Sequence, residues 1–301
     1  MIEVKSVTKK YGEFTAIENI NLTVDDCSVL GIAGFNGSGK TTLLNVCAGV
    51  FKADKGAVYL DGKDVFDNDE EKLSLFYVSD NMWFPVGATI LSAAKYYASY
   101  FSQFDFNLLK NICDVFNLDM KKTIKSFSKG MTRQAGLAIA FASKPKYLLI
   151  DETFDGLDPH KKEVVRKLLL EYINENSASV IISSHDLAEI SGVCDRVAIM
   201  NGSTIVLDAS IDDISNDFRK VVAIFAEPVS QELFAQFNCR HLKVSGKTAS
   251  MTLRGNVDEQ LEKLSALKPV SINTALLTLE EVFSEETEAQ TDNEKIKRIF
   301  K

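Results

Sequence analysis

The sequence contains few of the residues that build metal and disulfide sites. Its 301 residues include five cysteines and three histidines, and no two cysteines form a CxxC pair. Structural zinc sites and the disulfide frameworks of secreted domains both depend on clustered cysteines. The scattered thiols therefore argue against these two classes of protein and favour a reducing cytosol.

Long hydrophobic runs are also missing. The longest stretch without a charged residue extends from Asn81 to Ala94 and is interrupted by Pro85 and Gly87. A membrane helix needs about 20 consecutive apolar residues. The first residues, MIEVKSVTKKYG, are typical of a charged strand, so we expect no apolar signal segment. We therefore expect a chain that does not cross a membrane by itself.

An excess of basic residues is absent too. The formal net charge is −8 and the isoelectric point is about 5.1, which gives no support for a general affinity for nucleic acid. Hydrophobic residues make up 46% of the sequence and charged residues 25%, as in soluble globular proteins with a substantial core. The length allows one large domain and a small one.

Strand and helix patterns alternate along most of the chain, which predicts an α/β fold for residues 1–217. An apolar strand pattern over 27–35 precedes a helix pattern over 40–51, and the same rhythm returns after residue 147. Between about 87 and 125 the spacing becomes helical and rich in aromatic residues. This segment predicts a helical insertion. Further on, Asn201 and Gly202 predict the turn of a hairpin.

The pattern changes again near residue 218. Three strand patterns and one helix pattern predict a small α+β domain over residues 218–284. Residues 285–301 form a charged tail that we expect to be solvated.

The segment GFNGSGKTT, residues 34–42, has the pattern G-x-x-x-x-G-K-[ST] between a predicted strand and a predicted helix. Its glycines let the backbone wrap around phosphate, and the amides of the helix start point towards the anion. Lys40 would place positive charge on the β- and γ-phosphates, and the Thr41 hydroxyl would bind Mg²⁺. The segment predicts nucleotide binding without giving the class of enzyme.

Two adjacent carboxylates end another apolar strand. In KYLLIDETFDGLDP, residues 146–159, Asp151 and Glu152 follow the apolar run directly. Two acids in a site that also holds a triphosphate would repel each other without a cation. The pattern therefore predicts that one of the two carboxylates contacts Mg²⁺ and that the other polarises an attacking water.

The segment SFSKGMTRQ, residues 126–134, predicts the start of a helix. Ser128 is a suitable N-cap for the helix pattern over residues 131–143. Lys129 and Gly130 leave amides and positive charge uncovered at this helix start, which raises the question of the anion that they serve.

Taken together, these segments resemble the nucleotide-binding subunit of an ABC transporter. The resemblance rests on five short motifs in order over about residues 1–215, namely GFNGSGKTT, FSKGM, YLLIDE, GLD and SSHD. It implies a P-loop NTPase fold with a RecA-like core, an antiparallel β subdomain and a helical subdomain. It also implies ATP and Mg²⁺ as cofactors.

The resemblance assigns roles to residues of this chain. Tyr11 is similar to the aromatic residue on which adenine stacks, although an ordinary packing role stays open. Asp151 resembles the acid that is associated with Mg²⁺, and Glu152 resembles the general base or water-orienting carboxylate. His185 resembles the switch histidine at the γ-phosphate, and Asp158 belongs to the D-loop. The phosphates would be cradled by a continuous loop that consists of Gly34, Phe35, Asn36, Gly37, Ser38, Gly39, Lys40, Thr41 and Thr42.

The signature FSKGM implies a pair of subunits. In the family this helix start faces the γ-phosphate held by the other subunit, so Ser128, Lys129 and Gly130 would complete a neighbouring site. Lys129 stands where glycine is usual, and it either strengthens that contact or points to solvent.

A second departure concerns the metal. Asp80 aligns with a glutamine that in the family reaches Mg²⁺ and relays the nucleotide state to the helical insertion. Its shorter, anionic side chain either acts on the metal through water or has lost the relay.

The expected function is that of a cytoplasmic ATPase subunit, peripheral at the inner face of the cell membrane, which dimerises and drives a separate polytopic permease. Residues 279–283 look like the C-terminal end of ATPase subunits from bacterial drug or antimicrobial-peptide export and immunity systems. Export of a drug, peptide or similar amphipathic substrate is therefore favoured over import. Homodimer and heterodimer both stay open, and no nucleic-acid partner is expected.

Three alternatives are set against this interpretation. The first is an importer ATPase. The second is a soluble ABC ATPase acting on ribosomes or DNA, but such proteins usually carry two cassettes or a long coiled coil, whereas one phosphate loop and no heptad run occur here. The third is an inert regulatory cassette, which Asp80 alone favours. Intact Lys40, Asp151, Glu152 and His185 argue against it.

Overall fold

The structure is a computed structural model that describes residues 1–152 and 154–287. The chain forms two compact units, Met1–Asp208 and a second unit that begins at Ala209. The first unit contains two sheets and the second contains one, and each unit has its own core.

A six-stranded sheet forms the centre of the first unit, in the order β10-β9-β3-β8-β7-β6. The five strands from β9 to β6 in this order are all parallel to one another. Every residue of β3, β7 and β8 is buried, as expected for parallel strands that are covered on both faces. The strands are β3 Val29–Gly34, β6 Leu75–Val78, β7 Tyr147–Asp151, β8 Ser179–Ser184, β9 Arg196–Asn201 and β10 Thr204–Ser210.

A second, antiparallel sheet has the order β2-β1-β4-β5. Its apolar residues share one core cluster with residues of α1 (Lys40–Cys47) and of β3. Gly56 allows the close approach of β4 to β1, because a Cβ there would lie 2.2 Å from the Lys5 carbonyl oxygen. The strands are β1 Ile2–Tyr11, β2 Phe14–Val24, β4 Lys55–Leu60 and β5 Lys63–Asp64.

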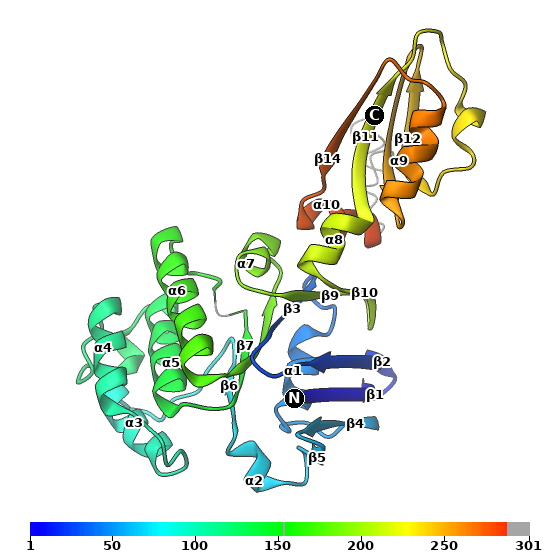
Figure 1. The fold of residues 1–301 in the computed structure, drawn as a ribbon. Helices are drawn as coiled ribbons and strands as arrows, with labels where there is room; N and C mark the ends of the chain where they lie inside the picture. The colour runs from blue at the N-terminus through cyan, green and yellow to red at the C-terminus, as the bar shows by residue number, and fades with distance from the viewer. Residues whose placement is uncertain (153, 288–301) are drawn as a thin grey trace, which may run out of the picture. The chain divides into compact units, whose positions relative to one another are not determined.

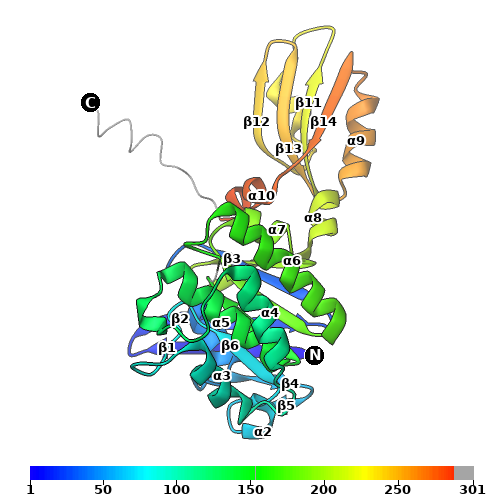
Figure 2. The same cartoon turned by 90° about the vertical axis from the view of Figure 1, so that its left-hand side faces the viewer.

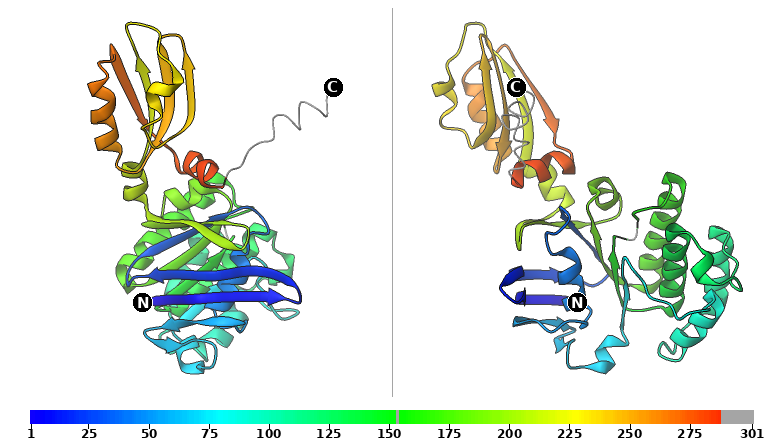
Figure 3. Two further views of the ribbon diagram at one scale, coloured as in Figure 1. Left: turned by 90° about the vertical axis from the view of Figure 1, so that its right-hand side faces the viewer. Right: turned by 180° about the vertical axis from the view of Figure 1, so that it is seen from behind.

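Most of the remaining helices of this unit lie on the side of the parallel sheet that faces away from the antiparallel sheet. Helices α3, α4 and α5 stand on one side of β6 and β7, and β1, β2 and β4 stand on the other (Figure 1, and from behind in Figure 3). Both α3 and α4 pack against α5. The elements are α2 Asp69–Lys72, α3 Ile90–Ala98, α4 Phe106–Phe116, the 3₁₀ turn η1 Ile124–Ser126, α5 Lys129–Ser143, α6 Pro159–Asn176 and α7 Leu187–Ser191.

Local sequence explains where these helices begin. Thr89 caps α3 in a capping box with Ser92, and Asp105 caps α4 through the amides of its first turn. Ser128 caps α5 as predicted, since its Oγ accepts from the Met131 amide. The segment 87–125 thus contains the two helices α3 and α4, and both pack against α5.

The second unit is a four-stranded antiparallel sheet with the order β12-β13-β11-β14, and α9 covers one of its faces (Figure 2). Its small core contains Phe234, Leu253 and Leu264, each almost fully buried. The elements are α8 Ile211–Asp217, β11 Phe218–Ile224, η2 Gln231–Phe234, β12 Cys239–Ser245, β13 Thr248–Arg254, α9 Val257–Ala266, β14 Ser271–Leu276 and α10 Leu279–Glu286.

This architecture confirms the predicted fold class. Two predicted positions differ from the structure, the domain boundary and the hairpin turn. The compact units divide between Asp208 and Ala209, whereas the pattern places the boundary between residues 217 and 218. The reason is that α8 runs directly into β11 and packs against it. The hairpin also turns one residue later than predicted, since Asn201 ends β9 and Gly202 begins the turn.

The expected solvated tail is wrong for its first residues. Glu285 and Glu286 belong to α10, and their side chains are 9% and 6% exposed. They pair with His241 at 3.2 Å and with Arg254 at 3.1 Å, and these partners make the burial of the two carboxylates possible. Residues 288–301 of the predicted tail lie outside the described residues.

A search of residues 1–152 and 154–287 finds no helix whose length and apolarity would let it cross a bilayer.

Truncation of Phe141 tests how α5 is anchored. Phe141 is 1% exposed, and its ring centroid lies 5.1 Å from that of Tyr172 on α6. We expect Phe141→Ala to lower the free energy of unfolding by about 3–5 kcal/mol, because the helices cannot close the cavity. Urea unfolding followed by circular dichroism measures this. The control Val115→Ala, at a position of α4 that is 53% exposed, should change it by less than about 0.5 kcal/mol. Equal effects would contradict the packing described.

Candidate nucleotide-binding site

The segments singled out in the sequence meet at one edge of the parallel sheet. β3 leads into the glycine-rich loop, β7 ends at Asp151, and β8 is followed by His185. The carboxyl ends of parallel strands form the usual ligand edge of such sheets. A cleft of about 410 Å³ opens there, and it is lined by Tyr11, Phe14, Ala16, Asn36, Gly37, Gly39, Lys40, Thr41, Thr42, Asp80 and Glu152.

The glycine-rich loop has a backbone that few other residues allow. Gly37 and Gly39 have φ of +85° and +94°, in the left-handed region that favours glycine. At Gly39 space is limiting as well, since a Cβ there would lie 2.5 Å from the Ala16 carbonyl oxygen. Gly39 is also the N-cap of α1 and gives no side-chain cap to its first amides. These amides are therefore available to an anion.

Ser38 adds an unusual polar group to this loop. Its side chain is buried, with 5% exposure, and its Oγ has no hydrogen-bond partner in the described part of the chain. Buried hydroxyls are normally paired. The loop thus offers uncapped amides and an unpaired hydroxyl, a combination that fits the oxygens of a phosphate group.

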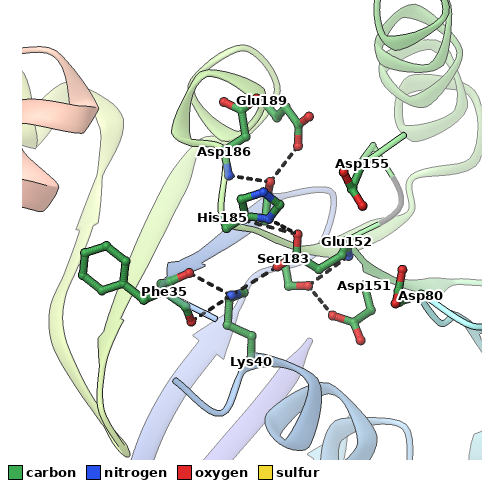
Figure 4. Close-up of polar contacts among 12 residues, drawn as sticks. Phe35, Lys40, Asp80, Asp151, Glu152, Asp155, Ser183, His185, Asp186 and Glu189 are labelled. Carbon is green, nitrogen blue, oxygen red and sulfur yellow. Dashed lines mark hydrogen bonds and ion pairs between the residues drawn. The ribbon is translucent and has the colours of Figure 1, made fainter. Parts of the chain in front are cut away.

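The Lys40 side chain is buried against the backbone of the glycine-rich loop. Its side chain is 5% exposed, and its ammonium donates to the carbonyl oxygens of Gly34 at 2.8 Å and Phe35 at 3.3 Å. The same nitrogen is 3.2 Å from Oε1 of Glu152. Figure 4 shows the Phe35 ring pointing away from Lys40 while the Phe35 carbonyl faces it. Lys40 therefore holds a buried positive charge beside the loop.

Glu152 connects Lys40 to His185 (Figure 4). While Oε1 faces Lys40, Oε2 lies 2.7 Å from His185 Nδ1. The backbone of Glu152 has a φ of +48° and donates to the carbonyl oxygen of Ser183 at 3.1 Å. Left-handed backbone is uncommon for a residue with a side chain and concentrates at functional sites. Both carboxylate oxygens are thus held in fixed directions.

Asp151 is fully buried at the end of β7. The Ser183 hydroxyl donates to its Oδ1 at 2.5 Å, and the Tyr77 hydroxyl donates to its Oδ2 at 3.2 Å. Burial and the nearby carboxylate raise the pKa of Tyr77 well above its usual value, so its hydroxyl stays protonated and donates.

Two exposed aromatic side chains form another wall of the cleft. Tyr11 is 47% exposed, and its ring meets that of Phe51 edge to face at 6.2 Å. Phe14 is 64% exposed and lines the same cleft, a role that the sequence analysis missed. The sequence feature that could have identified Phe14 is its position: it is an aromatic residue next to the turn at Gly12, where a side chain is not expected to be buried.

Asp80 lines the cleft, but its carboxylate is paired elsewhere. Oδ1 accepts from Arg133 Nη2 and lies 3.7 Å from Lys129 Nζ. Arg133 also reaches Asp155, as does Lys129. Neither Arg133 nor Asp155 was a predicted site residue. Among residues 1–152 and 154–287, no three side chains of His, Cys, Asp or Glu gather into a metal-binding group.

The signature segment packs against its own chain. Ser128 Oγ caps α5, and Lys129 Nζ lies 3.5 Å from Asp155 Oδ2, so this lysine has anionic partners within its own chain. A Cβ at Gly130 would lie 2.9 Å from the Gly156 carbonyl oxygen, which explains why this position is glycine. Asp158 caps α6, since its Oδ1 accepts from the Lys161 amide at 2.9 Å.

Comparison with known proteins agrees with this geometry. Residues 17–155 match the ABC transporter family. The chain is 25% identical to the ABC transporter ATP-binding protein YtrB of Bacillus subtilis, over 94% of this chain and 97% of that protein. It is 27% identical to the bacitracin transport ATP-binding protein BcrA of Bacillus licheniformis, over 73% of each chain. It is 26% identical to the lantibiotic transport ATP-binding protein SrtF of Streptococcus pyogenes, over 72% of this chain and 93% of that protein.

Solved structures show the same fold. An ATP-binding subunit of an ABC transporter matches with a TM-score of 0.66 and 24% identity, over 72% of this chain and 92% of that one. The dimeric cassette MJ0796 matches with a TM-score of 0.63 and 23% identity, over 70% of this chain and 99% of that one. Residues 17–155 therefore match the ATP-binding domain of the ABC transporter family, and the chain is an ATPase.

Proposed function

We propose that this ATPase is the energy-supplying subunit of a bacterial exporter, and that it drives a separate membrane permease for an antimicrobial peptide or a similar amphipathic compound. The observation that carries the proposal is the chain of contacts from Lys40 through Glu152 to His185 beside the phosphate loop. It supplies a cation for phosphate and an oriented carboxylate at one edge of the sheet.

The residues of the cleft fit ATP. The loop from Gly34 to Thr42 would cradle the phosphates. The Lys40 ammonium would leave its ion pair with Glu152 and bind a phosphate oxygen instead. Tyr11, exposed on the opposite wall, would stack on adenine. An entering phosphate keeps Lys40 paired, so its buried charge is never left without a partner.

Oxygen ligands suited to Mg²⁺ are present as well. Thr41 and Asp151 would hold the ion, because hydroxyl and carboxylate oxygens are the ligands that it prefers. When bound, Mg²⁺ neutralises the charge that develops on the phosphates. Glu152 would orient the attacking water, and His185 would keep this carboxylate in place through its Nδ1.

A second ATPase subunit would complete the site. Ser128, Lys129 and Gly130 lie at the N-terminal end of α5, where the helix dipole and Lys129 both favour an anion, and this end of the helix would face the γ-phosphate of the other subunit. Asp158 would lie in the same interface.

Substitution of Glu152 tests its chemical role. We expect Glu152→Gln to lower the ATP turnover rate at least about 100-fold, because an amide cannot accept a proton, while ATP binding is retained. Phosphate release and binding of a fluorescent ATP analogue are the two measurements. Asp114→Asn, which removes an exposed carboxylate from α4, should leave both unchanged. Unchanged turnover in Glu152→Gln would rule out the catalytic assignment.

Substitution of Gly39 tests the phosphate cradle. We expect Gly39→Ala to weaken ATP binding at least about tenfold, since the added methyl would collide with the Ala16 carbonyl and displace the loop amides. Isothermal titration calorimetry measures the affinity. The control Gly202→Ala has a similar left-handed φ of +60° but open space around its Cβ. Gly202→Ala should bind ATP with the affinity of the parent protein. An equal loss of ATP affinity in both variants would contradict the role of the close approach between Gly39 and the Ala16 carbonyl.

The surface for the permease would lie on the helical part of the first unit. Trp83, Tyr96 and Tyr100 are 78%, 61% and 51% exposed, whereas Tyr97 is mostly buried against Phe76. Exposed aromatic rings of this kind are enriched at protein interfaces. Such a contact would place the ATPase at the inner face of the membrane.

Export is supported by two relatives whose names refer to bacitracin and lantibiotic transport. We expect the ATPase to co-purify with a polytopic membrane protein after mild detergent extraction. We also expect its deletion to lower the inhibitory concentration of such a peptide several-fold, with Glu152→Gln unable to restore resistance. Co-purification with ribosomes or DNA instead would refute the transporter function, and peptide uptake that depends on the ATPase would refute export.

A further inference from the structure

Four charged side chains meet where α5 begins. Asp80 follows β6, Asp155 follows β7, and Lys129 and Arg133 project from the first two turns of α5. We call these four residues the α5 charge cluster. It joins three segments that are distant in sequence, and its two carboxylates balance its two cations.

Arg133 is the centre of the α5 charge cluster. Its side chain is 3% exposed, and its guanidinium binds Asp80 through Nη2 and Asp155 through Nη1, the latter at 3.3 Å. A guanidinium can serve two carboxylates at once because its donors are arranged in a planar fork. A buried charge is costly unless it is paired. Loss of either carboxylate, or its movement away from Arg133, would therefore leave the buried guanidinium with fewer partners and destabilise the protein.

The α5 charge cluster is also connected to Glu152. The Asp155 amide donates to the Glu152 carbonyl oxygen at 3.2 Å, so the backbone of Asp155 is hydrogen-bonded to that of Glu152. One residue further on, the carbonyl oxygen of Gly156 would lie 2.9 Å from a Cβ at position 130, so only glycine fits between it and the start of α5. Burial opposes ionisation of Asp155, but Arg133 and Lys129 hold the pKa of its carboxyl below the usual value, so Asp155 carries its charge at neutral pH.

We propose that Arg133 is a positioning residue which, together with Lys129, fastens the start of α5 to the segments after β6 and β7, and that Asp80 serves this contact instead of binding the cation of the nucleotide cleft. A carboxylate held by a guanidinium is a poorer ligand for a divalent cation, and its transfer to one would leave Arg133 buried with a single partner. The proposal rests on the proposed function, in which the start of α5 completes the site of a second subunit.

A double-mutant cycle in the Glu152→Gln background tests this. Asp80→Asn, Arg133→Gln and the double variant are compared by thermal unfolding, by ATP-driven dimerisation in light scattering, and by the Mg²⁺ dependence of ATP-analogue binding. We expect each single variant to lower Tm by roughly 5 °C. The double variant should lose no more than the worse single variant, because both remove the same contact.

The other two readouts separate a positioning role from the alternatives. We expect each single variant to raise the ATP concentration for half-maximal dimerisation at least about fivefold, because the start of α5 is no longer fixed. The Mg²⁺ concentration for half-maximal binding should stay within about twofold of the parent value in Asp80→Asn. A tenfold rise in that concentration would instead identify Asp80 as a cation ligand and overturn the proposal. Lower Tm with unchanged dimerisation would overturn it too, by reducing Arg133 to a purely structural residue.

Two further variants serve as controls. Asp114→Asn removes a carboxylate from the exposed pair with Lys110, whose side chains are both more than 60% exposed, and should change Tm by less than about 2 °C. Arg133→Lys keeps the charge but lacks the fork, so an intermediate dimerisation value is expected. If the Glu152→Gln parent itself binds no ATP or fails to dimerise, the proposed function fails and the positioning role fails with it. If the parent dimerises and the variants match it, the positioning role alone is wrong.

Discussion

Repulsion between carboxylates at one edge of the parallel sheet is the constraint on which the site depends. Asp151 ends β7, and Glu152 and Asp80 follow β7 and β6, at the edge of the sheet where a polyphosphate would add more negative charge. Like charges at one edge of a sheet repel one another unless neighbouring groups compensate them. The structure compensates each carboxylate differently: Lys40 faces Glu152, Arg133 faces Asp80, and two hydroxyls donate to Asp151.

These three kinds of compensation suit different tasks. A hydroxyl donates without bringing a charge, so it leaves the anionic character of Asp151 available to a cation. The lysine ammonium is a compact point charge on a flexible stem, which lets Lys40 change partner. The guanidinium of Arg133 is a rigid fork that binds two carboxylates and gains little from releasing either. Exchange is therefore easiest at Lys40 and most costly at Arg133.

Features that depend on local chemistry could be predicted from the sequence. The glycines around Lys40 need left-handed backbone, and Ser128 accepts from an amide three residues away, so both features could be predicted from neighbouring residues. The α5 charge cluster could not, because Asp80 and Arg133 are 53 residues apart and no periodic pattern connects them. For the same reason Lys129 was assigned either to a neighbouring subunit or to solvent, although carboxylates of its own chain lie within 4 Å of it.

The two ends of α5 are held by different forces, and this difference bears on how a nucleotide can act on the helix. Its later turns are buried by apolar contacts such as those of Phe141, which are non-directional and are lost only as a whole. Its first turns depend on ion pairs, whose energy changes with every charge brought near them. A triphosphate in the cleft that Asp80 lines is such a charge. Binding of a triphosphate would therefore change the position of the start of α5 and would not move the helix as a rigid body.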